Sequence, residues 1–530
     1  MKKFFILTLV GILAAACELP KDIATSIDEI YNEEFANTFG DTDPNHTWSM
    51  VDNKYVELNL EQPSRVKIYV KTDKDYKLAG DYENVSGNCE LSFDAPMGCT
   101  DVYVTVNGIP YQNDKAKMRG MAAASEFEAD YTNPIESGDE YVYYKFEQIK
   151  MFKKNAATLP ERVNNSDKVN MDYRVISNGN PYKFYPLFWN ADYKHSFGLY
   201  YFENGERKEI DFYIDKQGDC LQFKNSEGKW QDIVTDYAYE GIFAQQNIAD
   251  SDSVLRGKYF TINLPKGTEF GFYVDVTSNS NGAETFKGRY YSAPELNPNA
   301  SYSTFAYMEM GDNTYITIED RNDDDFDYND FIFIMEGTQE HITKDPVEYV
   351  YAVEDLGSTC DFDFNDIVFS VSHVNGQEHA NVKLLAAGGT LPAYICFNNY
   401  SSKEVHQMFG VDTKEMVNTQ KGTTKETMKA AKAFTVTVGK EWSHMAFTEK
   451  GNGFKVKVKK NDKTIEVQTP GANSDDAPQM LILPSKWLWP TERTSINDAY
   501  PSFGIWGANY TNTEWVNEVV NENVINWVTE

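Results

Sequence analysis

The sequence predicts a mostly β fold, built as multidomain β-sandwiches with a few short helices. Aromatic residues make up 14% of the chain, with 34 Tyr and 32 Phe, and such side chains favour strands. Apolar and polar residues alternate over many short runs, which is the period of a half-buried strand. Gly, Pro, Asn and Asp separate these runs and predict turns. The length of 530 residues predicts roughly two to four domains.

The N-terminus has the pattern of an export signal. Two lysines precede the apolar run Phe4–Leu13, which is too short to span a bilayer. Ala14–Ala16 before Cys17 resembles the lipobox of bacterial lipoproteins, although the usual leucine lies one place early. The resemblance implies a lipoprotein signal peptide over 1–16, lipidation of Cys17 and a tether over 17–38. The alternative is an ordinary signal peptide that leaves the cysteine unmodified.

The charge of the chain limits its partners. The formal net charge is −32, which repels nucleic acid and anionic lipid. No segment after the signal is long and apolar enough to cross a membrane as a helix. We therefore expect a protein anchored to the outer membrane by lipid and facing outward, with the periplasmic face as the alternative. Its ligand, an extracellular protein or a glycan, is not identified by the sequence, and nucleic acid is excluded.

Residues 39–113 are expected to form a small β-sandwich. Apolar residues alternate in several runs between Tyr55 and Val106, with turn residues between the runs, as in a sandwich of short strands. A short helix is expected before this block, over Ile27–Phe39. The turn-rich element Phe39–Trp48 connects the two.

Two larger blocks follow, a central β domain over 138–340 and a β-rich domain over 345–530. Strands are expected in the central domain over Tyr141–Phe146, Phe197–Phe202, Ile210–Ile214, Tyr259–Leu264, Phe270–Val276 and Tyr315–Ile318. In the last domain they are expected over Ile367–Val371, Val382–Ala386, Ala433–Val438 and Phe454–Val458. Apolar residues on one face predict a helix over Lys403–Phe409. A terminal helix is expected over Asn512–Trp527.

Two nearly identical acidic strings carry the clearest chemistry. Asp325–Asp330 reads Asp-Phe-Asp-Tyr-Asn-Asp, and Asp361–Asp366, which begins 36 residues later, reads Asp-Phe-Asp-Phe-Asn-Asp. Each follows a Glu-Asp pair and precedes an apolar run. Carboxylates this close repel one another unless a cation lies among them, and calcium takes six to eight oxygen ligands. The predicted ligands of a structural calcium are Glu319, Asp320, Asp325, Asp327, Asn329, Asp330, Glu354, Asp355, Asp361, Asp363, Asn365 and Asp366.

The EF-hand is a poor description of these strings. In the first string the sixth position is Asp330 where an EF-hand needs glycine, and Phe331–Ile334 reads as a strand instead of a helix. In the second, Ser372 stands at the twelfth position. The strings therefore predict strand-loop calcium sites. The alternative is a pair of solvated, turn-rich loops that bind nothing.

The position of the strings suggests a joint. The first closes the central block and the second opens the last block, so we expect calcium to stiffen the junction between two domains. A third Asp-x-Asp-x-Asn occurs as Asp41, Asp43 and Asn45 and predicts a third metal site.

Five cysteines follow Cys17, so at least one thiol is free in a monomer. Cys89 and Cys99 flank a short apolar stretch and could form a disulfide across a hairpin. The alternative is that all five are buried apolar residues. There is no CxxC and no zinc-site spacing.

Several stretches together resemble a known module. An LruC-type domain, an uncharacterised module of bacterial surface lipoproteins, is similar to the stretches Glu354–Phe369, Leu384–Pro392, Glu404–Gly410, Met416–Thr419 and Ala499–Trp506. Phe39–Trp48 resembles a short element near the start of such proteins. The central block resembles domains of unknown function that end in the same acidic pattern and are regarded as calcium-associated. These resemblances imply a surface lipoprotein and no established activity.

The sequence contains no familiar catalytic motif. It has no His-Glu-x-x-His, no Gly-x-Ser-x-Gly and no phosphate-binding glycine loop. We expect a non-enzymatic cell-surface protein with a role in adhesion, surface assembly or ligand capture. The alternative is a carbohydrate-binding or carbohydrate-active protein, which would use exposed Trp487, Trp489 and Trp506 as stacking surfaces.

Overall fold

The computed structural model describes most of the chain. The described ranges are 24–111, 117–119, 131–132, 134–144, 169–189, 193–215, 221–224, 229–232, 255–280, 283–297, 303–310, 313–320, 328, 330–356, 360–445, 452–468 and 476–527. The lipidation residue Cys17 and the predicted ligands Asp325, Asp327 and Asn329 lie outside them. Within these ranges, no helix has the length and apolar character needed to cross a membrane.

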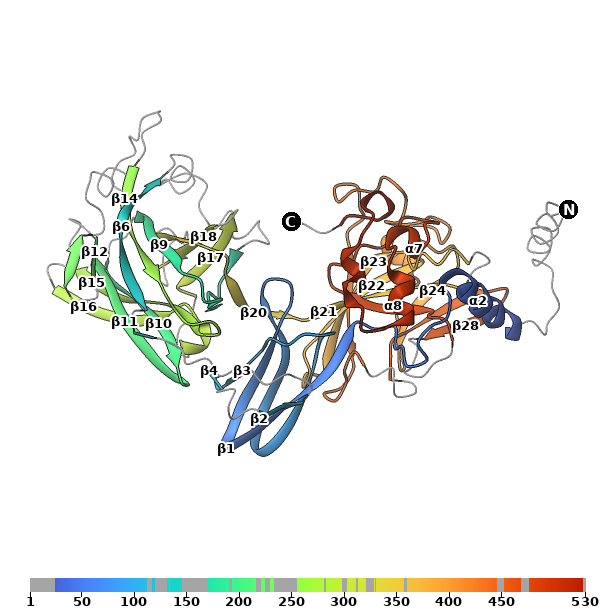
Figure 1. The fold of residues 1–530 in the computed structure, drawn as a ribbon, viewed down its shortest axis with the longest axis horizontal. Helices are drawn as coiled ribbons and strands as arrows, with labels where there is room; N and C mark the ends of the chain where they lie inside the picture. Colours follow the sequence, from blue (N-terminus) through green and yellow to red (C-terminus); the bar gives the residue numbers. More distant parts are fainter. Residues whose placement is uncertain are drawn as a thin grey trace.

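The fold is mostly β, as predicted (Figure 1). The described strands form sheets of 13, 7, 5 and 4 strands, and the helices that accompany them are short. The domain boundaries drawn from the sequence stay predictions.

The N-terminal part is a helix followed by a long ribbon. α2 (Ala24–Phe39) confirms the predicted helix. β1 (Val51–Lys71) and β2 (Tyr76–Pro96) pair antiparallel along their length. The short strands of this part are β3 (Val102–Val106), β4 (Ile109–Pro110) and β5 (Lys117–Arg119).

The central domain is a sandwich of two sheets. Its elements are β6 (Ile135–Tyr144), β7 (Val169–Asn170), β8 (Val175–Ile176), β9 (Tyr182–Trp189), β10 (Lys194–Glu203), β11 (Glu206–Asp215), β12 (Leu221–Lys224), β13 (Trp230–Asp232), β14 (Leu255–Ile262), β15 (Glu269–Ser280), β16 (Ala283–Tyr291), η2 (Pro294–Leu296), β17 (Phe305–Met310), β18 (Asn313–Ile318) and β19 (Phe331–Glu336). Seven of them form one sheet in the order β6-β14-β9-β19-β18-β17-β7. The facing sheet contains β10 and β15, and Phe184 stacks on Phe272 across the interface at 4.7 Å between ring centroids. Each predicted central run overlaps a strand, which confirms those predictions.

The C-terminal domain repeats this design. Its strands are β21 (Glu348–Val353), β22 (Ile367–His373), β23 (His379–Ala386), β24 (Ala393–Phe397), β25 (Tyr400–Ser401), β26 (Lys432–Thr437), β27 (Lys455–Lys460), β28 (Lys463–Gln468) and β29 (Met480–Pro484). They form the sheets β26-β23-β22-β21-β29 and β25-β24-β27-β28. Phe369 of the first sheet lies 6.0 Å from Phe454, which precedes β27 of the second. The helices are α6 (Val405–Phe409), α7 (Ile496–Ala499) and α8 (Phe503–Ala508), and α6 confirms the predicted one.

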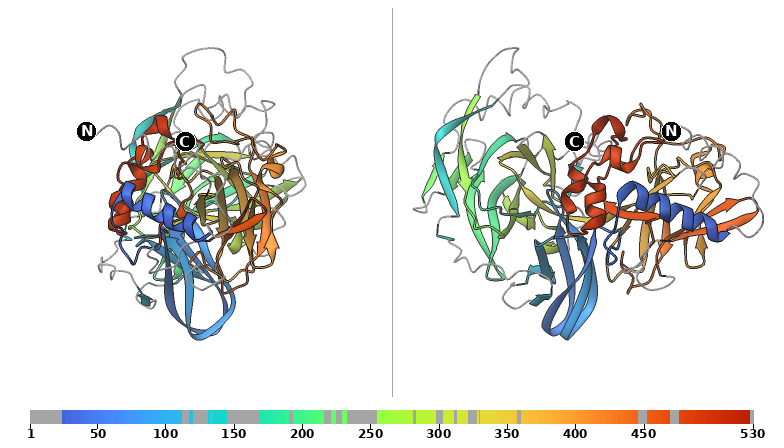
Figure 2. Two further views of the ribbon diagram at one scale, coloured as in Figure 1. Left: turned by 90° about the vertical axis from the view of Figure 1, so that its right-hand side faces the viewer. Right: turned by 45° about the vertical axis from the view of Figure 1, so that its right-hand side comes forward.

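The N-terminal ribbon shares the core of the C-terminal domain. Buried Val56 and Phe93 of the ribbon belong to the same hydrophobic cluster as Val350 of β21. Strands β1 to β5 lie in one sheet, where the sequence suggested a small sandwich by itself. Figure 2 shows the ribbon below the C-terminal helices, with α2 beside them, and the ring of Phe39 in α2 lies 5.2 Å from that of Phe503 in α8.

Among the described strands, β20 joins the central domain to the ribbon by strand pairing. β20 (Glu340–Pro346) pairs antiparallel with β8 of the central domain and parallel with β2 of the ribbon. The largest sheet therefore continues from one part into the other. An ion pair supports the connection, because Lys71 Nζ lies 2.6 Å from Glu340 Oε1.

The predicted terminal helix over Asn512–Trp527 is wrong. That segment contains two 3-10 turns, η4 (Thr513–Asn517) and η5 (Asn521–Asn523), and Val524 forms a β-bridge to Pro490. The segment is rich in Asn and Val, which have low helix propensity. Burial of Trp515, whose ring stacks on Trp506 at 4.9 Å, fixes the backbone instead.

Candidate metal sites

The two acidic strings each lie between a pair of antiparallel strands; of the first string, the structure describes Tyr328 and Asp330. β18 pairs with β19 up to Ile318 and Phe331, and β21 pairs with β22 up to Val353 and Ile367. Each loop therefore runs from a strand through a Glu-Asp pair and the acidic string into the next strand. This confirms that a strand, and not the helix of an EF-hand, follows each string.

Two hydrogen bonds from the backbone to carboxylates close the second loop. The amide of Asp355 donates to Asp366 Oδ2 at 2.7 Å. The amide of Phe364 donates to Glu354 Oε1 at 2.6 Å. The Glu-Asp pair before the string is thus part of the loop, as the sequence predicted from its repetition.

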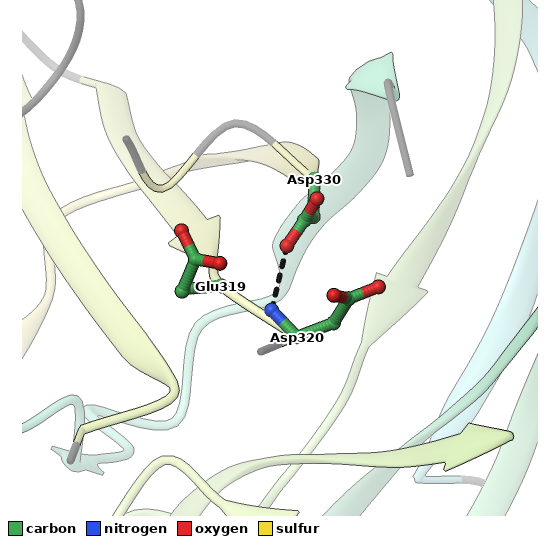
Figure 3. A group of neighbouring side chains, drawn as sticks. All are labelled: Glu319, Asp320 and Asp330. Atoms are coloured by element: carbon green, nitrogen blue, oxygen red, sulfur yellow. Dashed lines mark hydrogen bonds between the residues drawn. The ribbon is translucent and has the colours of Figure 1, made fainter. Parts of the chain in front are cut away.

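The first loop closes with the same two bonds. The amide of Asp320 donates to Asp330 Oδ2 at 2.6 Å, and that of Tyr328 donates to Glu319 Oε2 at 3.3 Å. The side chains of Glu319, Asp320 and Asp330 each place an oxygen within 4.8 Å of the others (Figure 3). His195 of β10 adds a contact from the facing sheet, with its Nε2 atom 2.8 Å from Asp320 Oδ2.

The aromatic residues between the oxygen donors have a left-handed backbone conformation. Phe362, Phe364 and Tyr328 have φ values of 50°, 51° and 52°, which residues other than glycine adopt at a cost of roughly 1–3 kcal/mol. Burial of the rings offsets this cost, since these three residues are only 2%, 0% and 5% exposed. The ring of Phe362 lies 5.4 Å from that of Phe35 in α2. The repeated aromatic residue therefore fixes the loop to the core.

The second loop gathers carboxylates from two distant parts of the chain. Asp361, Asp363 and Glu492 each place an oxygen within 4.8 Å of the others. Asp363 is held by the amides of Asn365 at 3.2 Å and Arg493 at 2.8 Å. Sequence reasoning missed Glu492, because it follows a different strand and belongs to no acidic string.

Asn365 and two glycines complete the second loop. Asn365 is fully buried, its Nδ2 donates to the carbonyl of Pro490 at 3.0 Å, and its Oδ1 has no hydrogen-bond partner among the described residues. A Cβ atom on Gly388 would lie 2.3 Å from that Oδ1, and one on Gly389 would lie 2.6 Å from Asp355 Oδ2. The glycines are required because the backbone packs directly against the oxygen donors.

The electrostatics of the second loop favour a bound cation. Burial raises the pKa values of Glu354, Asp363 and Asp366 well above their usual range, and neighbouring carboxylates raise them further. Carboxylates that face one another in a buried site require a proton or a cation nearby. All the donors are oxygen atoms, including the unsatisfied Asn365 Oδ1, and this donor set suits a hard cation such as calcium.

Among the described residues, the two loops supply separate groups of carboxylates, and no joint between the loops is present. They close hairpins in different sheets, and their carboxylates form two separate groups. The sequence suggested that calcium in these two loops stiffens the junction between two domains, and the loops do not lie at such a junction. The pairing of β20 with β2 and β8 forms the junction instead.

The third acidic string forms a local turn. Asp43 Oδ1 accepts hydrogen bonds from the amide and the side-chain Nδ2 of Asn45, at 2.8 and 3.3 Å, which is an Asx turn. Asp41 and Asp43 are in neither of the acidic groups that the described residues bring together. A metal site at Asp41, Asp43 and Asn45 thus has no structural support here.

The cysteines Cys89 and Cys99 are both free thiols, so the predicted disulfide between them is wrong. Cys89 lies in β2 opposite Leu58, while Cys99 follows the end of that strand. Extended backbone rises about 3.3 Å per residue, so the six strand residues between Cys89 and Pro96 hold the two thiols apart.

The tryptophans considered as sugar-stacking surfaces are buried. Trp487, Trp489 and Trp506 are 3%, 0% and 0% exposed. They pack in the C-terminal core and present no face to a glycan.

In the comparison with known proteins, one family model matches part of the chain. No curated protein matches it. One solved structure, a provisionally assigned lipoprotein from Bacteroides ovatus, is similar at 16% identity and a TM-score of 0.25, over 48% of this chain and 90% of the other; this likeness is too low to support an argument. Residues 264–338, from the segment before β15 to the end of the β18–β19 hairpin with its acidic loop, match the family model of a domain of unknown function, DUF4114.

Proposed function

We propose that the chain is a non-enzymatic, lipid-anchored surface protein whose β domains are stabilised by calcium in the two hairpin loops. One observation carries the metal assignment: two loops in different sheets close with the same pair of amide-to-carboxylate hydrogen bonds. Such a repeated local design around clustered carboxylates is expected where each loop holds the same ion. The role of the protein would be adhesion, surface assembly or ligand capture.

Calcium is favoured over magnesium by the kind and number of donors. The second loop offers oxygens from Asp361, Asp363 and Glu492, and Asn365 of the same string has a buried Oδ1 without a hydrogen-bond partner among the described residues. Calcium accepts six to eight such oxygens in irregular geometry, whereas magnesium requires a regular octahedron and keeps several waters.

A non-enzymatic role is supported by how the carboxylates are held. Asp363 and Asp366 accept bonds from backbone amides within their own loop or the neighbouring segment, which fixes them as ligands. A glycosidase needs two carboxyl groups that face each other across a bound sugar. The lipid anchor and the surface location rest on the sequence over 1–17 and stay proposals.

Calorimetry and thermal unfolding of the chain without its signal peptide test the metal. We expect two calcium-binding events, and a melting temperature about 5 °C higher at saturating calcium than with a chelator. Magnesium at the same concentration should give a smaller shift. If calcium gives neither binding heat nor a change in melting temperature, the calcium proposal is wrong.

Labelling with a radioactive or alkyne fatty acid in the producing cells tests the anchor. The wild-type chain should take up the label and sediment with membranes, and Cys17→Ala should do neither. A Cys360→Ala control should behave as wild type, because Cys360 lies far along the chain from the signal.

A further inference from the structure

The lysines of the chain are concentrated in one part of it. Residues 403–468 contain 13 Lys against 8 Asp and Glu, a net charge of +5. Because the whole chain has a net charge of −32, the other residues together carry −37. Such an asymmetry indicates a local partner of opposite charge or a local structural need.

The densest part of this region is the β27–β28 hairpin. It contains five lysines between Lys455 and Lys463. Val456 and Val458 of β27 are fully buried in the C-terminal core. Since side chains alternate across a strand, Lys455, Lys457 and Lys459 lie together on the opposite, outer face of the sheet.

An aromatic ring lies within this face. Tyr394 of β24 is directly opposite Lys457 in the pairing of β24 with β27. Lys459 Nζ lies 5.1 Å from the centroid of the Tyr394 ring. We call Lys455, Lys457, Lys459 and Tyr394 the lysine face; β24 and β28 lie toward one end of the molecule in Figure 1.

Little negative charge compensates the lysine face. Glu466 of β28 is directly opposite Lys457 in the pairing of β27 with β28, and its Oε1 forms an ion pair with Lys455 Nζ at 2.6 Å. Among the described residues, no carboxylate lies within ion-pair distance of Lys457 or Lys459, and Lys459 is exposed. The face is therefore a local positive surface on an otherwise acidic protein.

Protection of a sheet edge does not account for these lysines. Proteins often place lysine on edge strands to prevent pairing with another chain. Here β28 is the edge strand, and β27 pairs on both sides, with β24 and β28. The three lysines of β27 point away from the sheet and not along its edge.

We propose that the lysine face binds an anionic polysaccharide. A row of lysines along an extended strand presents charges at every second residue, which suits a linear polymer with regularly spaced carboxylate or sulfate groups. Clusters of lysine of this density are typical of polyanion-binding surfaces. Tyr394 provides a ring on which a sugar can pack.

The strongly acidic remainder argues against other polyanions. A planar anionic membrane would repel the rest of the chain, which carries a net charge of −37. Duplex nucleic acid carries one charge per about 1.7 Å of its axis, so the same repulsion is stronger. A narrow, moderately charged chain can follow the lysine face alone.

Binding to immobilised dextran sulfate and to polygalacturonate at about 50 mM salt tests the proposal, with neutral dextran as the reference polymer. The experiment is run with chelator and repeated with calcium, so that a failure of the calcium proposal is seen separately. We expect wild-type binding that weakens as salt increases. K457E/K459E should weaken it at least tenfold, and K457R/K459R should retain it.

A charge-matched variant provides the control. K266E/K287E changes the net charge equally at exposed lysines of the central domain, and we expect wild-type binding from it. Equal weakening by this control would overturn the proposal, as would absence of binding by the folded wild-type chain. Tighter binding to vesicles with anionic lipid or to a DNA duplex than to either polysaccharide would overturn the choice of partner.

Discussion

The first and second acidic loops share their local structure and differ in what surrounds them. Both close with an amide of the Glu-Asp pair donating to the last aspartate of the string. The first loop is completed by His195 of the facing sheet, which contacts Asp320. The second is completed by Glu492 from beyond β29, and by the close approach of Gly388 and Gly389.

This difference separates what the local sequence determines from what the tertiary fold adds. The flanking strands and the Glu-Asp pair give the same two amide-to-carboxylate hydrogen bonds in both loops. The additional side chain, an imidazole in one loop and a carboxylate in the other, comes from a different sheet or segment. We therefore expect the two loops to respond differently to the changes below.

The largest effect is expected for Gly388→Ala. Its Cβ would lie 2.3 Å from Asn365 Oδ1 and 2.9 Å from the carbonyl oxygen of the same residue, so the second loop must distort, at a cost of about 3 kcal/mol. Urea unfolding with and without calcium measures this. Gly504→Ala is the matched control, because its Cβ would meet nothing nearer than 3.5 Å. Equal stability of the two variants would show that the glycine packing is unimportant.

His195→Phe should destabilise the first loop by about 2 kcal/mol. The change removes the contact of Nε2 with Asp320, and hydrogen bonds to charged groups contribute about 1.5–3 kcal/mol. Calcium affinity at the second loop should not change. His379→Phe, at an exposed position of β23, should stay within about 0.5 kcal/mol of wild type. A lower calcium affinity at the second loop in His195→Phe would mean that the two loops are coupled.

Glu492→Gln should lower the calcium affinity of one site about tenfold, equivalent to about 1.4 kcal/mol, and leave the other unchanged. The substitution keeps the size of the side chain and removes its charge from the group with Asp361 and Asp363. Calorimetry resolves this as one altered event out of two. If both events stay as in wild type, Glu492 is not a ligand.

The smallest effect is expected for Asp43→Asn. The side chain caps a local turn, and an amide oxygen can accept the same bond, so stability should change by about 0.5 kcal/mol or less. Both calcium events should be retained. Loss of a third binding event in this variant would restore the metal site that the sequence suggested there.

The sequence was most informative where the determinants are local. Alternating residues located β18 and β22, and the apolar run Phe331–Ile334 located β19, whereas β21 before the second string was not predicted. The Glu-Asp pairs were predicted as metal ligands, and the hydrogen bonds that they form within each loop were not predicted. Glu492 and His195 could not be found, because each reaches its loop across more than a hundred residues of chain. The terminal helix failed for a similar reason: burial of Trp515 decided the backbone of a segment whose local propensity was weak.

The shared core of the ribbon and the C-terminal domain has a consequence for how the chain is made. The hydroxyl of Tyr31 in α2 donates a hydrogen bond to the carbonyl of Pro478, which lies 447 residues later in the chain. A chain exported from its N-terminus cannot seat α2 until nearly the whole polypeptide has been delivered. The segment nearest the proposed anchor would thus be among the last to fold. A prematurely ended chain would reach the membrane with α2 unpacked, and proteases could cleave it there.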